Sequence, residues 1–238
     1  MNHAVLLSGG TGSRLGGGIP KQYLRARGTM VVTFALEALL VNPHIDDVFI
    51  VSEERYRDAI LSDAQACDCN IVKIKDFANP GGTRQESVMN GLQAIIMDWN
   101  GKPAFDEDTV LIHDAARPML SQSLINACYE ALGEHDGVMP VLPMKDTVYL
   151  TDGEGHLEGL LERERLFAGQ APELFRLGKY YEANMRLTDT ELAGMHGSSE
   201  PEVLAGMDIV TVPGDEGNFK ITTAGDLERF KAIKEAAG

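Results

Sequence analysis

A glycine-rich segment that carries two cations is the strongest chemical signal in the sequence. Residues 8–22 read Ser-Gly-Gly-Thr-Gly-Ser-Arg-Leu-Gly-Gly-Gly-Ile-Pro-Lys-Gln and follow an apolar run. Glycine permits backbone conformations in which successive N–H groups point at one anion. Arg14 adds a planar guanidinium and Lys21 a charge on a flexible stem. A plain surface turn needs neither cation, so the segment predicts a phosphate-binding loop.

Two familiar phosphate-binding motifs do not fit this segment. The dinucleotide fingerprint Gly-x-Gly-x-x-Gly would require glycine where Leu15 stands. A Walker A loop requires Gly-Lys-Ser/Thr, whereas Pro20 precedes Lys21 and Gln22 follows it. We therefore expect a different kind of loop for the phosphates of a nucleoside triphosphate.

Two further segments place polar groups where α/β proteins bind ligands. Gly81 and Gly82 precede Thr83, a predicted N-cap, so a ligand could approach the helix N-terminus closely. Asp114 ends an apolar strand, and a carboxylate at that edge suits the Mg²⁺ that accompanies nucleoside triphosphates. An ordinary capped helix and an aspartate that caps the next helix are the structural alternatives.

These residues require a layered α/β framework to bring them together. Short apolar runs alternate with amphipathic stretches, which is the pattern of that class. We see no internal repeat or low-complexity linker and predict a single domain over residues 1–238. The expected strands are 3–7, 47–51, 71–75, 109–113, 137–141 and 209–212, and the expected helices are 30–41, 54–67, 84–98, 121–132 and 223–237.

Residues 144–175 interrupt this alternation. A β-like run at 146–150 leads into the turn-rich stretch 151–156, and a second run returns over 157–165. We predict a protruding β-arm here. Such an arm needs a surface to pack on, and a second copy of the chain is the expected partner, which gives a homodimer.

Composition excludes several other classes of protein. The net charge of −15 argues against nucleic-acid binding, which needs a basic face. The sequence has no apolar run long enough to span a membrane, and its start lacks the basic region of a signal peptide. Three cysteines cannot all pair, so we expect free thiols and a cytoplasmic location.

Taken in order, the motifs resemble those of the polyol-phosphate cytidylyltransferases, which include enzymes for 2-C-methyl-D-erythritol 4-phosphate and for ribitol 5-phosphate. The loop pattern Gly-x-Gly-x-Arg-x-Gly…Pro-Lys-Gln is followed by the segments 81–92, 109–118 and 214–223 in the family's order. The resemblance covers nearly the whole chain. It implies a Rossmann-like, mostly parallel sheet of the nucleotidyltransferase (GT-A-like) type. It also implies transfer of the cytidylyl group of CTP to a polyol phosphate, with release of pyrophosphate.

The resemblance also implies roles for individual residues. Arg14, Lys21 and Lys220 would neutralise the triphosphate during catalysis, and Asp114 would bind Mg²⁺. The polyol phosphate would contact Arg117, Thr147 and Arg163, with Arg163 supplied by the partner subunit; read without the family, Arg163 is an ordinary solvated hairpin residue. The attacking phosphate is already an anion, so no general base is needed. The implied nucleotide contacts are Ser8, Gly9, Gly10, Thr11, Gly12, Gly82, Arg84 and Ser87.

The acceptor is the least determined part of this interpretation. Residues 114–118 look like the methylerythritol branch, whereas 9–12, 169–170 and 218–223 look like the ribitol branch. The family's Gln-Thr-Pro-Gln is Gln-Ala-Pro-Glu at 170–173, and Gly217 stands where the methylerythritol branch has Asp. If that carboxylate holds metal or substrate, Asp215, Glu216 or Asn218 would have to replace it.

We expect 2-C-methyl-D-erythritol 4-phosphate as the acceptor, ahead of ribitol 5-phosphate. A third polyol phosphate or a phosphonate remains an alternative acceptor. A sugar-1-phosphate nucleotidyltransferase, and a non-catalytic nucleotide-binding scaffold on the same fold, are alternatives of other classes.

Overall fold

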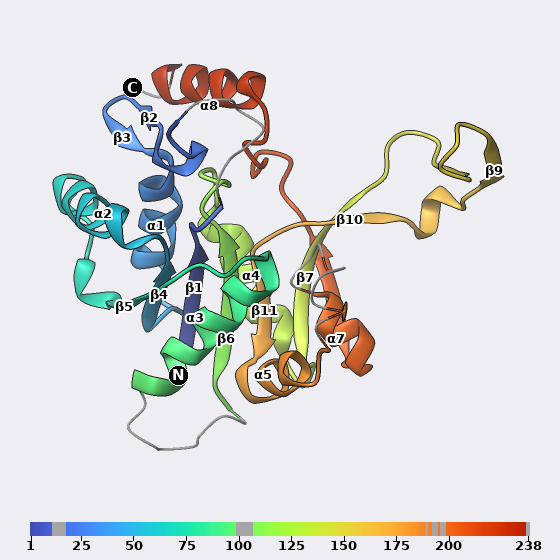
Figure 1. Cartoon of the computed structure of the whole chain (residues 1–238), viewed down its shortest axis with the longest axis horizontal. Coiled ribbons are helices and arrows are strands. Elements are labelled where there is room, and N and C mark those ends of the chain that lie inside the picture. Colours follow the sequence, from blue (N-terminus) through green and yellow to red (C-terminus); the bar gives the residue numbers. More distant parts are fainter. Residues whose placement is uncertain (11–17, 99–106, 189, 192–194, 196–198, 237–238) are drawn as a thin grey trace.

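A mixed, mostly parallel β-sheet forms the centre of the structure, a computed structural model that describes residues 1–10, 18–98, 107–188, 190–191, 195 and 199–236 (Figure 1). Within that part of the chain the strand order is β10-β7-β11-β6-β1-β4-β5, and β12 also pairs with β7. The strands are β1 (Asn2–Leu7), β4 (Asp47–Val51), β5 (Ile74–Ala78), β6 (Thr109–Asp114), β7 (Gly137–Pro143), β10 (Phe167–Gly169), β11 (Glu173–Arg176) and β12 (Ile209–Pro213). The predicted α/β class is confirmed.

Most strand pairs are parallel, and β11 is the exception in the middle of the sheet. β1 pairs in parallel with both β4 and β6, and β12 with β7. β11 runs antiparallel to β6 and to β7, and β10 antiparallel to β7. Because β1, β4 and β6 run in one direction, their carboxyl ends share one edge of the sheet, where Asp114 ends β6.

Helices cover both faces of the sheet because successive strand residues point to opposite sides. In β1, Leu6 packs in the cluster under α1 (Val31–Val41), α2 (Glu54–Ala66) and α4 (Gln122–Leu132). Its neighbour Val5 packs in the cluster under α3 (Arg84–Asp98) and α5 (Leu177–Met185).

The approach of α3 to the sheet depends on one glycine. A Cβ at Gly91 would lie 2.6 Å from Cγ1 of Val5. Such a contact is too short for any side chain, so glycine lets α3 lie directly on β1.

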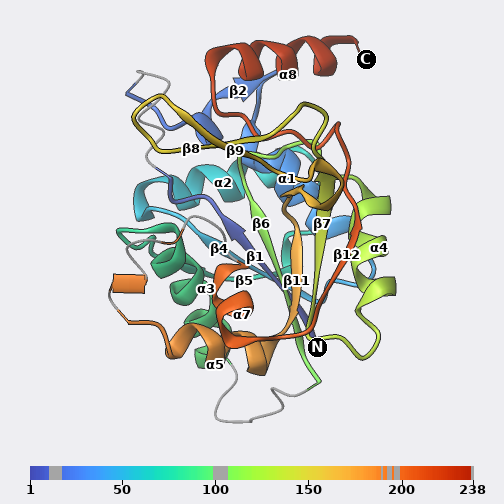
Figure 2. The same ribbon diagram turned by 90° about the vertical axis from the view of Figure 1, so that its right-hand side faces the viewer.

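A third cluster of buried side chains lies beyond one end of the sheet. There α8 (Ala224–Ala236) packs beside the small hairpin of β2 (Arg25–Ala26) and β3 (Thr29–Met30), as Figures 1 and 2 show. Two further short helices are the 3-10 helix η2 (Lys21–Tyr23), which packs near α1, and α7 (Glu200–Ala205), which packs beside α5. None of the helices in the described ranges has the length and apolarity to cross a membrane.

Most of the expected elements occur within one or two residues of their predicted ends. The strand expected at 71–75 is displaced: Ile71–Lys73 form the 3-10 helix η3, and the strand runs over Ile74–Ala78. Several further elements were not predicted, among them β11, α5, α7 and the hairpin of β2 and β3. β11 has only four residues and begins with a glutamate, so it lacks the apolar pattern by which a strand is identified.

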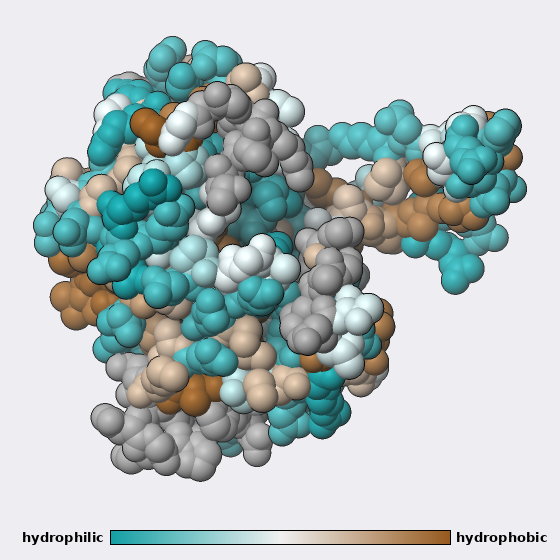
Figure 3. Space-filling view, viewed as in Figure 1, coloured by the Kyte–Doolittle hydropathy of each residue, from teal (hydrophilic) through white to brown (hydrophobic). Residues whose placement is uncertain are grey.

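The arm projects from the sheet as a two-stranded hairpin of β8 (Tyr149–Thr151) and β9 (Leu157–Leu160) (Figure 1). The 3-10 helix η4 (Arg163–Arg165) follows it. The predicted range 144–175 was too long at its end, because β10 and β11 belong to the central sheet. Figure 3 shows hydrophobic residues along the arm, and the exposed ones are Met144, Tyr149, Leu150, Leu157, Leu160, Leu161 and Phe167.

Candidate active site

A pocket of about 440 Å³ lies at the carboxyl edge of β1 and β6. It brings together residues that are far apart in sequence, from the first loop to the segment before α8. The predicted site residues that line it are Gly9, Gly10, Lys21, Gly82, Arg84, Ser87, Asp114 and Lys220, and the other lining residues are Leu7, Gln22, Gly81, Thr83, Ala116 and Thr222. Thr11, Gly12 and Arg14 lie outside the described residues.

Hydrogen bonds hold Lys21 next to the start of the glycine-rich loop. Gln22 Nε2 donates to the carbonyls of Ser8 and Gly10, each at 2.7 Å, and Tyr23 Oη donates to the carbonyl of Ser8 at 2.7 Å. Ser8 is buried, and its hydroxyl donates to Tyr23 Oη at 3.2 Å. Ser8 therefore stabilises the start of the loop through its hydrogen bonds to Gln22 and Tyr23, and its side chain does not line the pocket.

The opposite wall of the pocket is the N-terminus of α3. Thr83 Oγ1 accepts the Glu86 N–H at 3.1 Å, and Glu86 Oε2 accepts the Gly82 N–H at 2.6 Å. This reciprocal capping fixes the first turn, as the predicted N-cap at Thr83 required. Ser87 Oγ accepts the Gly81 N–H at 3.0 Å. The helix thus presents its positive end and Arg84 to the pocket.

The two walls approach each other through glycine. A Cβ at Gly9 would lie 2.2 Å from Cβ of Pro80, a distance that no side chain tolerates. The chain before α3 therefore lies against the chain after β1 only because residue 9 is glycine. Both walls of the pocket depend on this contact.

A cluster of charges forms the pocket floor around Asp114. Its Oδ1 lies 3.0 Å from Arg84 Nη2, its Oδ2 lies 2.8 Å from Lys220 Nζ, and Arg117 Nε lies 3.7 Å from Oδ2. Burial alone would raise the pKa of Asp114, but the charges of Arg84 and Lys220 outweigh burial and hold that pKa well below its usual range. Asp114 is therefore ionised at neutral pH, and the cations around it outnumber it.

Glu173 is a second buried carboxyl group near these cations. Glu173 lies on β11 opposite Ile112 of β6. Ile112 precedes Asp114 by two residues, so the side chains of Ile112 and Asp114 point to the same face of the sheet. Burial raises the pKa of Glu173 to about 7, against the attraction of Arg84. Sequence reasoning missed this neighbour because β11 itself was not predicted.

Thr147 and Arg163 lie on the arm and do not line this pocket. Both side chains are exposed, and Arg163 Nη1 donates to the carbonyl of Lys145 at 3.2 Å. Arg117 lies at the rim of the charge cluster, where its Nη1 donates to the carbonyl of Asn218 at 2.9 Å. The pocket thus brings together the predicted nucleotide-binding residues that the structure describes, apart from Ser8, whereas Thr147 and Arg163 lie elsewhere.

Comparison with known proteins agrees with this arrangement. The sequence model of the family described as 2-C-methyl-D-erythritol 4-phosphate cytidylyltransferase (IspD) matches residues 2–236. The chain is 33% identical over 233 residues to the enzyme of that name from Roseobacter denitrificans, which covers 98% of this chain and 96% of the relative. It is similar to the crystal structure of the Francisella tularensis enzyme, with a TM-score of 0.78 and 26% identity over 97% of this chain and 98% of the other.

Other relatives are longer. The "Bifunctional enzyme IspD/IspF" of Maricaulis maris is 35% identical over 228 residues, which are 95% of this chain and 55% of the relative. The chain therefore spans about half the length of the bifunctional relatives it matches.

Proposed function

Because the chain belongs to the 2-C-methyl-D-erythritol 4-phosphate cytidylyltransferase family, we propose that it transfers the cytidylyl group of CTP to that polyol phosphate. The products are the CDP-polyol, used in isoprenoid precursor synthesis, and pyrophosphate. The observation that carries the proposal is that one pocket is lined by four features. They are the glycine-rich loop, Lys21, the N-terminus of α3 and the Asp114–Lys220 pair.

The reaction needs positioning and charge neutralisation. A phosphate oxygen of the acceptor attacks the α-phosphorus of CTP, a new P–O bond forms, and the bond to the pyrophosphate oxygen breaks. Lys21 and Lys220 both line the pocket, where they can neutralise the triphosphate and the leaving pyrophosphate. Arg14 is proposed to add to them, and the backbone N–H groups before α3 favour an anion at the same place.

We further propose that Asp114 holds Mg²⁺ together with CTP. Among the described lining residues Asp114 is the one carboxylate, and no group of three or more His, Cys, Asp or Glu side chains gathers in the described part of the chain. Mg²⁺ is commonly held by one or two carboxylates with substrate phosphates and water, so this donor set fits it. When bound, the ion supplies charge stabilisation to the phosphates. Asp114 would then exchange part of its contact with Lys220 and Arg84 for the ion.

The arm suggests how the acceptor end of the site is completed. Thr147 and Arg163 lie on the arm away from the pocket of their own chain, while apolar side chains of the arm are exposed. We propose a homodimer in which the arm reaches the partner's pocket and supplies these two residues beside Arg117. The three cysteines are free, which agrees with the proposed cytoplasmic location.

Pyrophosphate release tests the assignment directly. CTP, UTP and dTTP are each incubated with Mg²⁺ and with 2-C-methyl-D-erythritol 4-phosphate, ribitol 5-phosphate or a sugar 1-phosphate. We expect release with CTP and the methylerythritol compound. Release with ribitol 5-phosphate alone would move the acceptor to the other branch, and release with UTP and a sugar 1-phosphate but not with CTP would overturn the proposal.

A further inference from the structure

The segment that carries Lys220 is held from the base of the arm by one buried amide side chain. Gln170 follows β10, the strand that returns from the arm, and is 3% exposed. Its Nε2 donates to the carbonyl of Asp215 at 2.9 Å and to that of Asn218 at 3.3 Å, and its Oε1 accepts the Asp215 N–H at 3.0 Å. One side chain thus makes three hydrogen bonds to the loop 214–220.

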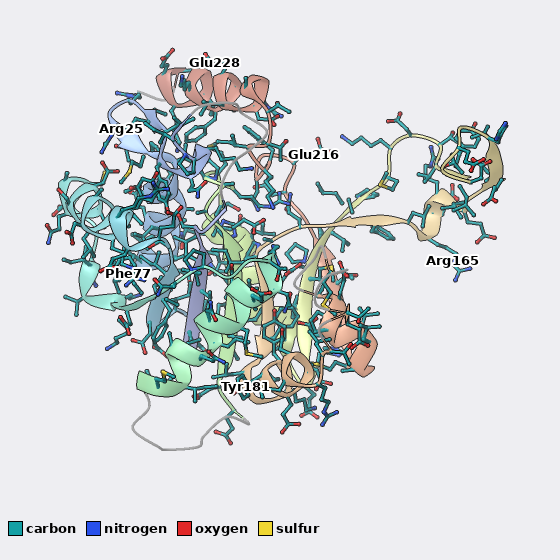
Figure 4. All side chains as sticks on the ribbon, viewed as in Figure 1. Arg25, Phe77, Arg165, Tyr181, Glu216 and Glu228 are labelled. Atoms are coloured by element: carbon teal, nitrogen blue, oxygen red, sulfur yellow. The ribbon has the colours of Figure 1, made fainter. Side chains whose placement is uncertain are left out.

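The two ends of the arm share this loop. On the returning side, Asn218 Nδ2 donates to the carbonyl of Ala171 at 2.7 Å. On the outgoing side, Lys145 Nζ lies 2.5 Å from Glu216 Oε1. Figure 4 shows Glu216 beside the base of the arm, with Arg165 far out along it. The exposed Lys145–Glu216 pair contributes little by itself, so the buried bonds of Gln170 and Asn218 do most of the holding.

The same bonds lead directly to the pocket floor. The carbonyl of Asn218 accepts from Gln170 on one side and from Arg117 Nη1, at 2.9 Å, on the other. Two residues later Lys220 Nζ reaches Asp114, and the next residue, Ile221, donates its N–H to the carbonyl of Ala116 at 2.8 Å. Hydrogen bonds from Gln170 and Arg117 therefore hold the chain just before Lys220, and they determine where Lys220 lies.

From this geometry we propose that Gln170 is a positioning residue, which sets Lys220 and Arg117 against Asp114 and links their placement to the base of the arm. Gln170 does not line the pocket, and its side-chain hydrogen bonds go to Asp215 and Asn218, so it acts through the loop. A displacement of about 1 Å at a charged group that contacts the reacting phosphates can cost on the order of 100-fold in rate. The inference rests on the proposed function, since it assigns Lys220 to the phosphates of CTP.

A double-mutant cycle between Gln170→Met and Lys220→Met tests the proposal. Methionine has nearly the same length as glutamine and removes all three hydrogen bonds without opening a cavity. We expect Gln170→Met to lower kcat by roughly 10- to 100-fold with the fold retained by circular dichroism. In the Lys220→Met background the same substitution should lower kcat by a clearly smaller factor, because only the placement of Arg117 is then left to disturb and residues that act through one another are not additive.

The matched control is Gln122→Met on α4. Gln122 also makes partly buried hydrogen bonds: its Nε2 donates to the carbonyl of Ala38 at 2.8 Å, and its Oε1 accepts from Asn42 Nδ2 at 2.9 Å. It does not line the pocket. We expect a lower Tm and an unchanged kcat for this variant. If Gln170→Met does not fold, Gln170→Glu replaces it in the cycle, because a carboxylate keeps the size and the bond from the Asp215 N–H but cannot donate to the two carbonyls.

Calorimetry measures the CTP affinity of the wild type, the two single variants and the double variant of the cycle. This affinity distinguishes a failure of the proposed function from a failure of the positioning role of Gln170. A wild-type chain that neither binds CTP nor releases pyrophosphate overturns the proposed function and, with it, the role of Gln170. An active wild-type chain in which the effects of Gln170→Met and Lys220→Met simply multiply, or in which Gln170→Met behaves as Gln122→Met does, overturns the positioning role alone.

Discussion

Lys220 Nζ lies 2.8 Å from Oδ2 of Asp114, although 106 residues separate them in the chain. The carboxylate expected to bind a metal ion therefore already has a cation on one oxygen, and Arg84 lies 3.0 Å from the other. Any ion that binds Asp114 must share these oxygens with Lys220 and Arg84.

Replacing Asp114 by Asn tests the metal proposal. The variant keeps the shape of the side chain but removes its charge, so Arg84, Arg117 and Lys220 lose their counter-ion. We expect CTP without Mg²⁺ to bind at least as tightly as to the wild type, and kcat with Mg²⁺ to fall by about 100-fold or more. Calorimetry with and without Mg²⁺ and a steady-state assay measure both. A variant with unchanged kcat and unchanged Mg²⁺ requirement would remove Asp114 from the metal site.

Replacing Lys21 by Ala tests the role of the glycine-rich loop. Lys21 lines the pocket, and η2 is fixed by Gln22 and Tyr23, so the substitution removes a charge and leaves the local backbone intact. We expect kcat to fall by about 100- to 1,000-fold with little change in Tm. Lys73→Ala is the control, since Lys73 bonds the carbonyl of Asn42 outside the pocket. Near-normal turnover by the Lys21 variant would contradict the assignment.

The burial of Glu202 predicts that the stability of the protein falls as the pH rises. Its side chain on α7 is fully buried, and neither carboxyl oxygen has a hydrogen-bond partner among the residues that the structure describes. Burial raises the pKa of Glu202 to about 9 in the folded chain, whereas an unfolded glutamate titrates near 4.3. Between these values the folded chain retains a proton that the unfolded chain has lost, so this group makes the protein less stable as pH rises through that window.

The variant Glu202→Gln does not titrate and avoids this loss. We expect it to be more stable than the wild type at pH 8, by roughly 2–4 °C in Tm or more, and the difference to shrink as pH falls toward 5. Thermal unfolding of both proteins from pH 5 to pH 8.5 measures it. A Tm difference that stays constant over this range would show that Glu202 titrates normally in the folded chain.

The arm predicts a link between assembly and activity. Leu157 and Leu160 are 68% and 67% exposed on β9, and a partner subunit would cover them. Leu157→Asp should therefore weaken the dimer, measured by light scattering, and lower the activity in parallel. Val72→Asp is the control, because Val72 is 80% exposed on η3, at a distance from the arm. Full activity in a monomeric Leu157→Asp protein would refute a role for the partner's arm in the site.

Much of the fold and of the candidate site could be predicted from sequence because the signals are local. The apolar run 3–7 and its following glycines indicated a strand that leads into an anion-binding loop, and the start of α3 was predicted from Thr83 as its N-cap. The family followed from the order of such motifs. The arm was visible from its turn-rich tip, although its end was placed too late.

Long-range pairing decided the rest. Only the tertiary structure inserts the four-residue β11 antiparallel between β6 and β7, and this insertion buries Glu173 beside the cations of the pocket. Only the tertiary structure places Lys220 and Arg84 on the two oxygens of Asp114, and Gln170 under the loop that carries Lys220. The sequence by itself determined the chemistry of each local segment, because glycine, charge and apolar periodicity act over a few residues. Which segments meet depends on strand order and burial, which no single segment encodes.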